Sequence, residues 1–140
     1  MKADHCIFFQ LAKASQTAIK FMSQKISALN ITPVQAMVIG FLAEEDQIMA
    51  GELGKKVELD SATLTGILDR LETAQLIERK GNPDDRRSVK IHLTKLGKET
   101  GLEAKKLIEE ANKEFLADFT ENEKRGLRGL ISKVREKISQ

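Results

Sequence analysis

Residues 59–72 read LDSATLTGILDRLE, and this stretch decides the fold. Asp60 is a good N-cap for a helix that begins at Ser61, and apolar residues follow at helical spacing. A shorter segment with helical periodicity, residues 50–57, precedes it across a short turn. The pattern therefore predicts two helices joined by a tight turn, the second of which buries Leu64, Ile67, Leu68 and Leu71.

After this pair of helices the apolar pattern changes its period. Residues 76–80 and 89–93 are short strand candidates, because apolar and polar side chains alternate in the second of them. The segment 81–85, Gly-Asn-Pro-Asp-Asp, consists of residues that favour turns and is expected to connect the two strands. A helix-turn-helix followed by a two-stranded hairpin is the layout of a winged helix-turn-helix, whose second helix can lie in the major groove of DNA.

Long helices are expected on both sides of this unit. The spacing predicts a first helix from about Asp4 to Leu29 and a helix from Thr94 to about Phe119. Capping boxes at Thr32 and Thr120 mark the starts of two further helices. The predicted fold class is mainly α with a small β-hairpin: a winged helix-turn-helix lobe with N- and C-terminal helices attached.

The exposed side of the predicted helix after Asp60 suits contact with DNA. Its small and hydroxylated residues let the backbone approach closely, and an arginine one turn further along can reach a phosphate or a guanine edge. The alternative is that the hydroxyl groups only cap the helix. Asp69 and Glu72 would oppose DNA, so we expect them to face sideways, with Asp69 or Asp60 orienting a basic neighbour. The candidate DNA-binding residues here are Ser61, Ala62, Thr63, Thr65, Gly66 and Arg70.

The positive charge of the chain is concentrated in and around the predicted hairpin. The formal net charge is +2 for 140 residues, whereas residues 79–98 hold seven basic and two acidic residues. A basic hairpin on a neutral or acidic body is typical of DNA contact. Arg86 and Arg87 at its tip suit the minor groove, whose negative potential attracts arginine where it narrows. The alternative interpretation is a solvated charged loop.

Composition excludes several other functions. One cysteine permits neither an internal disulfide nor a cysteine-based zinc site, so no metal and no cofactor is predicted. The chain has no Trp or Tyr for stacking on single-stranded bases, and no recognisable catalytic set, so it is not expected to be an enzyme. The apolar run at residues 6–9 is too short for a signal peptide or a membrane span, so a cytoplasmic protein without a membrane partner is expected.

Several motifs together resemble the MarR family of transcription regulators. They are residues 59–65 through Leu71-Glu72, then 76–79 (LIER), 85–89 (DRRSV) and 93–97 (LTKLG). The sequence of residues 60–65 most resembles that of the organic-peroxide-sensing branch of this family. The resemblance implies one domain over 1–140, with a DNA-binding lobe at about 30–100 and dimerisation helices at 1–29 and 101–140. It also implies that Asp85 and Arg87 pair to shape the hairpin, or wing, while arginine enters the minor groove of double-stranded DNA.

A homodimer is also expected from the apolar stripes of the terminal helices, which exceed what a domain of this size covers. The resulting prediction is a homodimeric repressor of a pseudo-palindromic operator. The resemblance further implies release by a small aromatic or acidic effector, with candidate pocket residues Phe8, Leu11, Met22, Met37 and Phe41. Two alternatives remain: a redox-sensing regulator that uses Cys6, although the branch's reactive position falls at Phe8, and a winged helix that binds protein.

Overall fold

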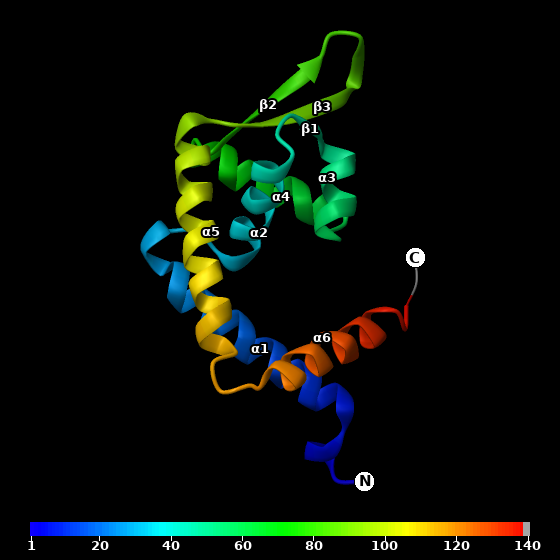
Figure 1. Cartoon of the computed structure of the whole chain (residues 1–140). Helices are drawn as coiled ribbons and strands as arrows, with labels where there is room; N and C mark the ends of the chain where they lie inside the picture. The colour runs from blue at the N-terminus through cyan, green and yellow to red at the C-terminus, as the bar shows by residue number, and fades with distance from the viewer. Residues whose placement is uncertain (139–140) are drawn as a thin grey trace.

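The computed structural model describes residues 1–138, except the side chains of Asn82, Arg86 and Arg87. It confirms a mainly α-helical winged-helix fold (Figure 1). In chain order the elements are η1 (Ala3–His5), α1 (Ile7–Ile26), η2 (Ser27–Leu29), α2 (Pro33–Glu44), β1 (Ile48–Met49), α3 (Ala50–Val57), α4 (Ser61–Thr73), β2 (Ile77–Asn82), β3 (Asp85–Leu93), α5 (Lys95–Phe115) and α6 (Glu121–Arg135).

The hydrophobic core lies within the lobe built from α2, α3, α4 and the sheet. Figure 1 shows this lobe at one end of α5, with β2 and β3 extending beyond it and with α1 and α6 at the other end of α5. The stripe predicted for α4 is fully buried, as expected. It packs with apolar side chains from the other elements of the lobe, chiefly Val38, Ile39, Leu42, Ile48, Leu53, Leu76, Ile77, Ile91 and Leu93.

The sheet has three antiparallel strands in the order β1-β3-β2, so the predicted two-stranded hairpin is incomplete. The additional strand β1 pairs Ile48 with Ile91. The hairpin strands are also longer than predicted, because Gly81 and Asn82 belong to β2. The register shifts between Gly81, which pairs with Val89, and Asn82, which pairs with Asp85. Residues 86–88 therefore lie between two paired positions near the tip of the wing.

The predicted helix starts are confirmed by their caps. Capping boxes are present at Thr32 and Thr120, where each threonine accepts a backbone N–H and the residue three positions later bonds back. Asp60 and Thr94 cap α4 and α5 through the N–H groups of Thr63 and Gly97. Local side-chain caps therefore mark the starts of four helices.

Two predicted helix ranges are wrong. The helix expected over 4–29 is interrupted at Cys6, whose ψ of 125° is extended, and it changes to a 3-10 turn after Ile26. That turn ends at Asn30 in the left-handed region, with φ of 54°. The helix expected to reach Phe119 ends at Phe115. Apolar periodicity continues through these breaks, so it did not reveal them.

The start of α5 is fixed by a close contact with the segment between α4 and β2. A Cβ on Gly97 would lie 1.9 Å from the carbonyl oxygen of Leu76, so only glycine fits there. The N–H of Thr94 donates to that same oxygen at 3.1 Å, and the Thr94 hydroxyl donates to the carbonyl of Gln75 at 2.7 Å. The segment after the wing is therefore held on the segment after α4.

The terminal helices leave large apolar side chains exposed. α1 and α5 contact each other through Phe21 and Phe115, whose rings meet edge to face at 5.2 Å, and through a Lys25–Glu114 ion pair. Elsewhere on α1, on α6 and just beyond α6, several apolar side chains are at least 39% exposed: Ile7, Phe8, Phe9, Leu11, Ile19, Leu130, Ile131, Val134 and Ile138. In a globular monomer such a set marks an interaction surface.

Within residues 1–138, no single helix has the length and apolar character to cross a membrane. Residues Ile7–Leu29 and Pro33–Glu44 meet those criteria only as a pair with a 72° bend.

Candidate nucleic-acid interface

The first turn of α4 is organised by Asp60. Its carboxylate accepts the N–H of Thr63 at 2.8 Å and the Thr63 hydroxyl at 2.8 Å. These two bonds hold the pKa of Asp60 below its ordinary value, and the bond from the N–H contributes most. Asp60 therefore remains ionised and keeps Thr63 in a fixed orientation at the exposed end of the helix.

The exposed face of α4 combines small groups with oriented hydroxyls. Ser61, Ala62, Thr63 and Thr65 are exposed, and nothing lies within 4 Å of the position that a Cβ would take on Gly66. The Thr65 hydroxyl donates to the carbonyl of Ser61 at 2.7 Å. Because the protons of both threonine hydroxyls are used within the protein, these groups present lone pairs and methyl groups outward. Such groups fit base amino groups and thymine methyls.

Arg70 is also exposed, so five of the six candidate positions on α4 are exposed and Gly66 is half-buried. The sequence could not show how Arg70 is placed among the carboxylates of the same helix. It lies with Asp69, Thr73 and Ala74 around a shallow depression on the C-terminal half of α4. It also lines a second depression, which extends from α4 to Leu96 and Thr100 of α5.

Arg79 of β2 binds both carboxylates of α4. Its guanidinium donates to Glu72 Oε1 at 2.9 Å and lies 2.7 Å from Asp69 Oδ1, and its backbone N–H donates to Glu72 Oε2 at 3.0 Å. Hydrogen bonding to Arg79 lowers the pKa of Glu72. The expectation that Asp69 would orient a basic neighbour is met by Arg79, which is consequently engaged with protein rather than free in the basic stretch.

The wing combines a shaped tip with a pair of exposed lysines. Asp85 accepts the hydroxyl of the buried Ser88 at 2.9 Å, across the register shift. Lys80 and Lys90 are direct cross-strand partners and both are exposed. Glu78 lies 3.8 Å from the Lys80 ammonium, and a bound anion would further reduce the repulsion between the two lysines. Sequence reasoning counted these lysines as charge but did not place them together.

The side chains of Arg86 and Arg87, expected at the wing tip, lie outside the described residues; only their places in β3 are defined. Their position between Asp85 and Ser88 puts both arginines at the register shift near the end of the wing.

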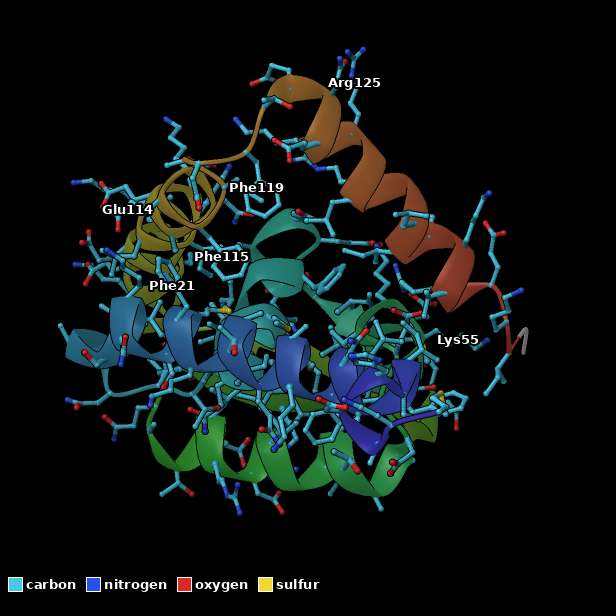
Figure 2. All side chains as sticks on the ribbon, turned by 90° about the horizontal axis from the view of Figure 1, so that it is seen from below. Phe21, Lys55, Glu114, Phe115, Phe119 and Arg125 are labelled. Carbon is cyan, nitrogen blue, oxygen red and sulfur yellow. The ribbon has the colours of Figure 1, made fainter. Side chains whose placement is uncertain are left out.

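The five candidate effector-pocket residues are not brought together. Met22 lines a pocket of about 250 Å³ between α1 and α5, with Ala18, Phe21, Ile108, Ala111, Asn112 and Phe115. Figure 2 shows Phe21, Glu114 and Phe115 where these helices meet. Phe8 is 78% exposed, Leu11 and Met37 are also exposed, and Phe41 packs on the core of the lobe. The half-buried Cys6 lies at the N-cap of α1.

Among residues 1–138, no group of three or more His, Cys, Asp or Glu side chains has an arrangement that would hold a metal ion. The described features are instead a recognition-type helix with a small polar face, an ordered wing base and exposed basic residues. This combination defines a winged helix-turn-helix protein of the class that regulates transcription.

The chain belongs to the MarR family. The sequence model of that family matches residues 31–89. The chain is similar to the homoprotocatechuate degradative operon repressor of Escherichia coli, with 30% identity over 86% of this chain and 82% of the relative. It is also similar to the organic hydroperoxide resistance transcriptional regulator of Bacillus subtilis, with 36% identity over 69% of this chain. That match spans 66% of the relative, which is less than two thirds of its length.

Solved structures of the same fold cover almost the whole chain. A probable transcriptional regulator from Pseudomonas aeruginosa has a TM-score of 0.87 and 28% identity, and covers 95% of this chain and 99% of its own. A cysteine mutant of MarR from E. coli, complexed with operator DNA, has a TM-score of 0.86 and 27% identity, and covers 96% and 99%. These relatives are regulators, which confirms the prediction that the protein is not an enzyme.

Proposed function

We propose that this protein is a homodimeric repressor that binds a pseudo-palindromic operator in double-stranded DNA. The observation that supports this most directly is the exposed, small and hydroxylated face of α4 beside a basic wing. The E. coli MarR structure with operator DNA and the E. coli operon repressor are consistent with it. Binding by α4 and the wing together would read one half-site per protomer.

In this proposal α4 contacts the major groove of the DNA and the wing contacts the minor groove. Ser61, Thr63 and Thr65 meet base edges or phosphates from α4, while Ala62 and Gly66 allow close approach. Arg70 contacts a phosphate or a guanine edge. On the wing, Asp85 shapes the tip, Arg86 and Arg87 enter the minor groove, and Lys80 with Lys90 binds a backbone phosphate.

The dimer in this proposal forms through the exposed apolar side chains of α1 and α6. Burying them against a second copy removes them from water and gives a closed two-fold assembly. A two-fold dimer on DNA places its recognition helices about 34–36 Å apart, which is one turn of the duplex. A pseudo-palindromic operator follows from that symmetry.

Release of the operator is assigned in this proposal to a small aromatic or acidic effector bound beside α1. The α1–α5 pocket offers Met22 and the Phe21–Phe115 pair as an apolar lining, and the Asn112 side chain as a polar group. An effector can release DNA only if it binds the DNA-incompetent arrangement more tightly than the competent one.

The test is a titration of the protein against the intergenic DNA upstream of its own gene at two salt concentrations. We expect log affinity to fall with log salt at about 0.9 per neutralised phosphate. Arg87→Ala should weaken binding, whereas Arg125→Ala, which removes the same charge from α6, is the matched control (Figure 2). Equal affinity of all three proteins would contradict the wing assignment. DNA affinity that does not depend on salt would contradict the phosphate contacts and favour the protein-binding alternative.

A further inference from the structure

The junction between α4 and β2 contains a clamp, defined here as Asp69, Glu72 and Arg79. Three interactions connect Arg79 to the helix: its backbone N–H and its guanidinium both bond Glu72, and the guanidinium also reaches Asp69. One guanidinium nitrogen, Nη2, lies between the two carboxylates, and the planar, rigid guanidinium fixes the direction of its contacts with both. The main-chain bond means that the strand itself, and not only a flexible side chain, is fixed to α4.

Arg79 lies on the inward face of the wing's base. In the ladder it pairs with Ile91, which is fully buried, whereas the next position pairs the exposed Lys80 with Lys90. Its side chain is 28% exposed, less than either carboxylate. The guanidinium is therefore directed towards α4 and away from the face on which a DNA phosphate would meet the lysines.

The clamp lies at the base of the wing, so a small rotation there displaces the wing tip. Pro83 lies four positions after Arg79, which is about 13 Å at roughly 3.3 Å per strand residue. A rotation of about 10° at the clamp would displace the wing tip by about 2 Å, on the scale at which hydrogen bonds are gained or lost. The angle between β2 and α4 therefore decides whether helix and wing contacts form on the same DNA molecule.

We propose that the Asp69–Glu72–Arg79 clamp is a positioning device that fixes the wing relative to α4, without itself contacting DNA. This inference rests on the proposed function. It assigns a use to two carboxylates that would otherwise only repel phosphates from the recognition helix. Arg79 is correspondingly a positioning residue rather than one of the basic residues that neutralise DNA.

The clamp and simple electrostatics predict opposite signs for one substitution. Glu72→Gln removes a negative charge from the DNA-binding helix, so electrostatics alone would strengthen binding. The clamp predicts binding weakened by about fivefold, because Arg79 loses its charged partner. Arg79→Lys keeps the positive charge but removes the planar guanidinium, and it should weaken DNA binding by a similar factor. Glu52→Gln, in the exposed first turn of α3, is the matched charge control and should leave affinity unchanged or slightly higher.

A double-mutant cycle separates positioning from direct contact. If the clamp acts through the wing, the loss caused by Arg79→Lys should be smaller in an Arg86→Ala/Arg87→Ala background, which lacks both wing-tip contacts, than in the wild type. Additive losses would show that Arg79 acts independently of the wing and would overturn the inference. Thermal unfolding of each variant shows that the fold is retained before affinities are compared.

A measurement without DNA distinguishes failure of the clamp from failure of the proposed function. Spin labels at Thr73→Cys and Asp84→Cys, in a Cys6→Ser background, report the distance between α4 and the wing tip. We expect a narrow distance distribution that broadens or shifts in Glu72→Gln and Arg79→Lys. An unchanged distribution overturns the clamp even if the protein binds DNA, whereas absence of DNA binding with a broadened distribution overturns only the proposed function.

Discussion

Asp60 joins the end of the helix-turn-helix turn to the first turn of α4. Its two bonds from Thr63 form only in the folded chain, so its pKa is lower in the folded state than in the unfolded one. The ionised carboxylate therefore stabilises the fold at pH values above the unfolded pKa. That contribution disappears as the pH falls through the folded pKa.

We expect Asp60→Asn to retain the helix cap but lose this pH dependence, since Asn caps helices about as well as Asp. Denaturant unfolding between pH 6 and about pH 3 should show the wild type losing stability more steeply than the variant. Asp60→Ala should be less stable than both near neutral pH. Parallel pH curves for the wild type and Asp60→Asn would contradict the role given to Asp60.

Gly66 is the residue at which stability and DNA binding should separate. Open space surrounds its missing Cβ, so Gly66→Ala should raise the free energy of unfolding by about 0.5–1 kcal/mol through helix propensity. The added methyl would occupy the face proposed to approach DNA, and operator affinity should fall by about tenfold, equivalent to about 1.4 kcal/mol.

Gly40→Ala is the control for that substitution. Gly40 lies in α2, also with open space at its Cβ position, and its replacement should stabilise the protein without weakening DNA binding. If Gly66→Ala bound the operator as well as the wild type, this face of α4 would not be the one that meets DNA. Denaturant unfolding and the operator titration provide the two readouts.

At the scale of elements, α4 ends in a turn that glycine would suit better than the residue present. Gln75 has a φ of 61°, and the N–H groups of Gln75 and Leu76 donate to the carbonyls of Glu72 and Leu71. This is the Schellman pattern, in which the left-handed position is usually Gly. Here the left-handed position is occupied by Gln, and the turn forms nonetheless.

We therefore expect Gln75→Gly to raise the free energy of unfolding by about 0.5–1 kcal/mol, because it removes the Cβ penalty of the left-handed conformation. The carbonyl of residue 75 would still accept the Thr94 hydroxyl. Thermal or denaturant unfolding measures the change. A destabilised variant would show that the Gln75 side chain supports the turn more than its backbone conformation strains it.

The elements that could be predicted from sequence are those with local signals. Capping residues such as Thr32 and Asp60 identify helix starts because each bonds N–H groups within its own first turn. The strand β1 was missed because it has only two residues and depends on β3, over forty positions away. Cys6 ends η1 in an extended conformation that apolar spacing does not encode.

The candidate site follows the same division. The exposed face of α4 was predictable, because helical periodicity determines which side is buried. The Arg79 partners were only half predicted: Asp69 and Glu72 are three residues apart on one helix, but the strand that brings Arg79 to them is placed by tertiary packing. The placement of the candidate effector-pocket residues was the least predictable, since the exposure of Phe8 and the partial burial of Phe41 depend on helix packing.

At the scale of the whole molecule, the exposed apolar side chains of α6 should control assembly. Leu130 is 62% exposed. We expect Leu130→Asp to convert the proposed dimer to a monomer, since a charge buried in an apolar interface is costly. Light scattering coupled to size exclusion measures the mass, and operator affinity should fall because only one half-site is engaged.

Leu96→Asp places the same charge on another exposed leucine, at the start of α5, and should leave the mass unchanged. A wild-type protein that is monomeric at micromolar concentration would contradict the proposed assembly. If Leu130→Asp remained a dimer while the wild type was dimeric, the interface would lie elsewhere than on this face of α6.

The close seat of Gly97 on Leu76 has a consequence for operator length. It fixes one end of α5 to the lobe, and the 21 residues of α5 extend about 31 Å from there to the contact with α1. Each degree by which a helix of that length tilts displaces its far end by about half an ångström. Since base pairs are stacked about 3.4 Å apart, a tilt of about 7° corresponds to one base pair of half-site separation. In the proposed dimer, a rigidly held α5 would therefore restrict binding to operators with one spacing between half-sites, and operators one base pair longer or shorter would bind more weakly.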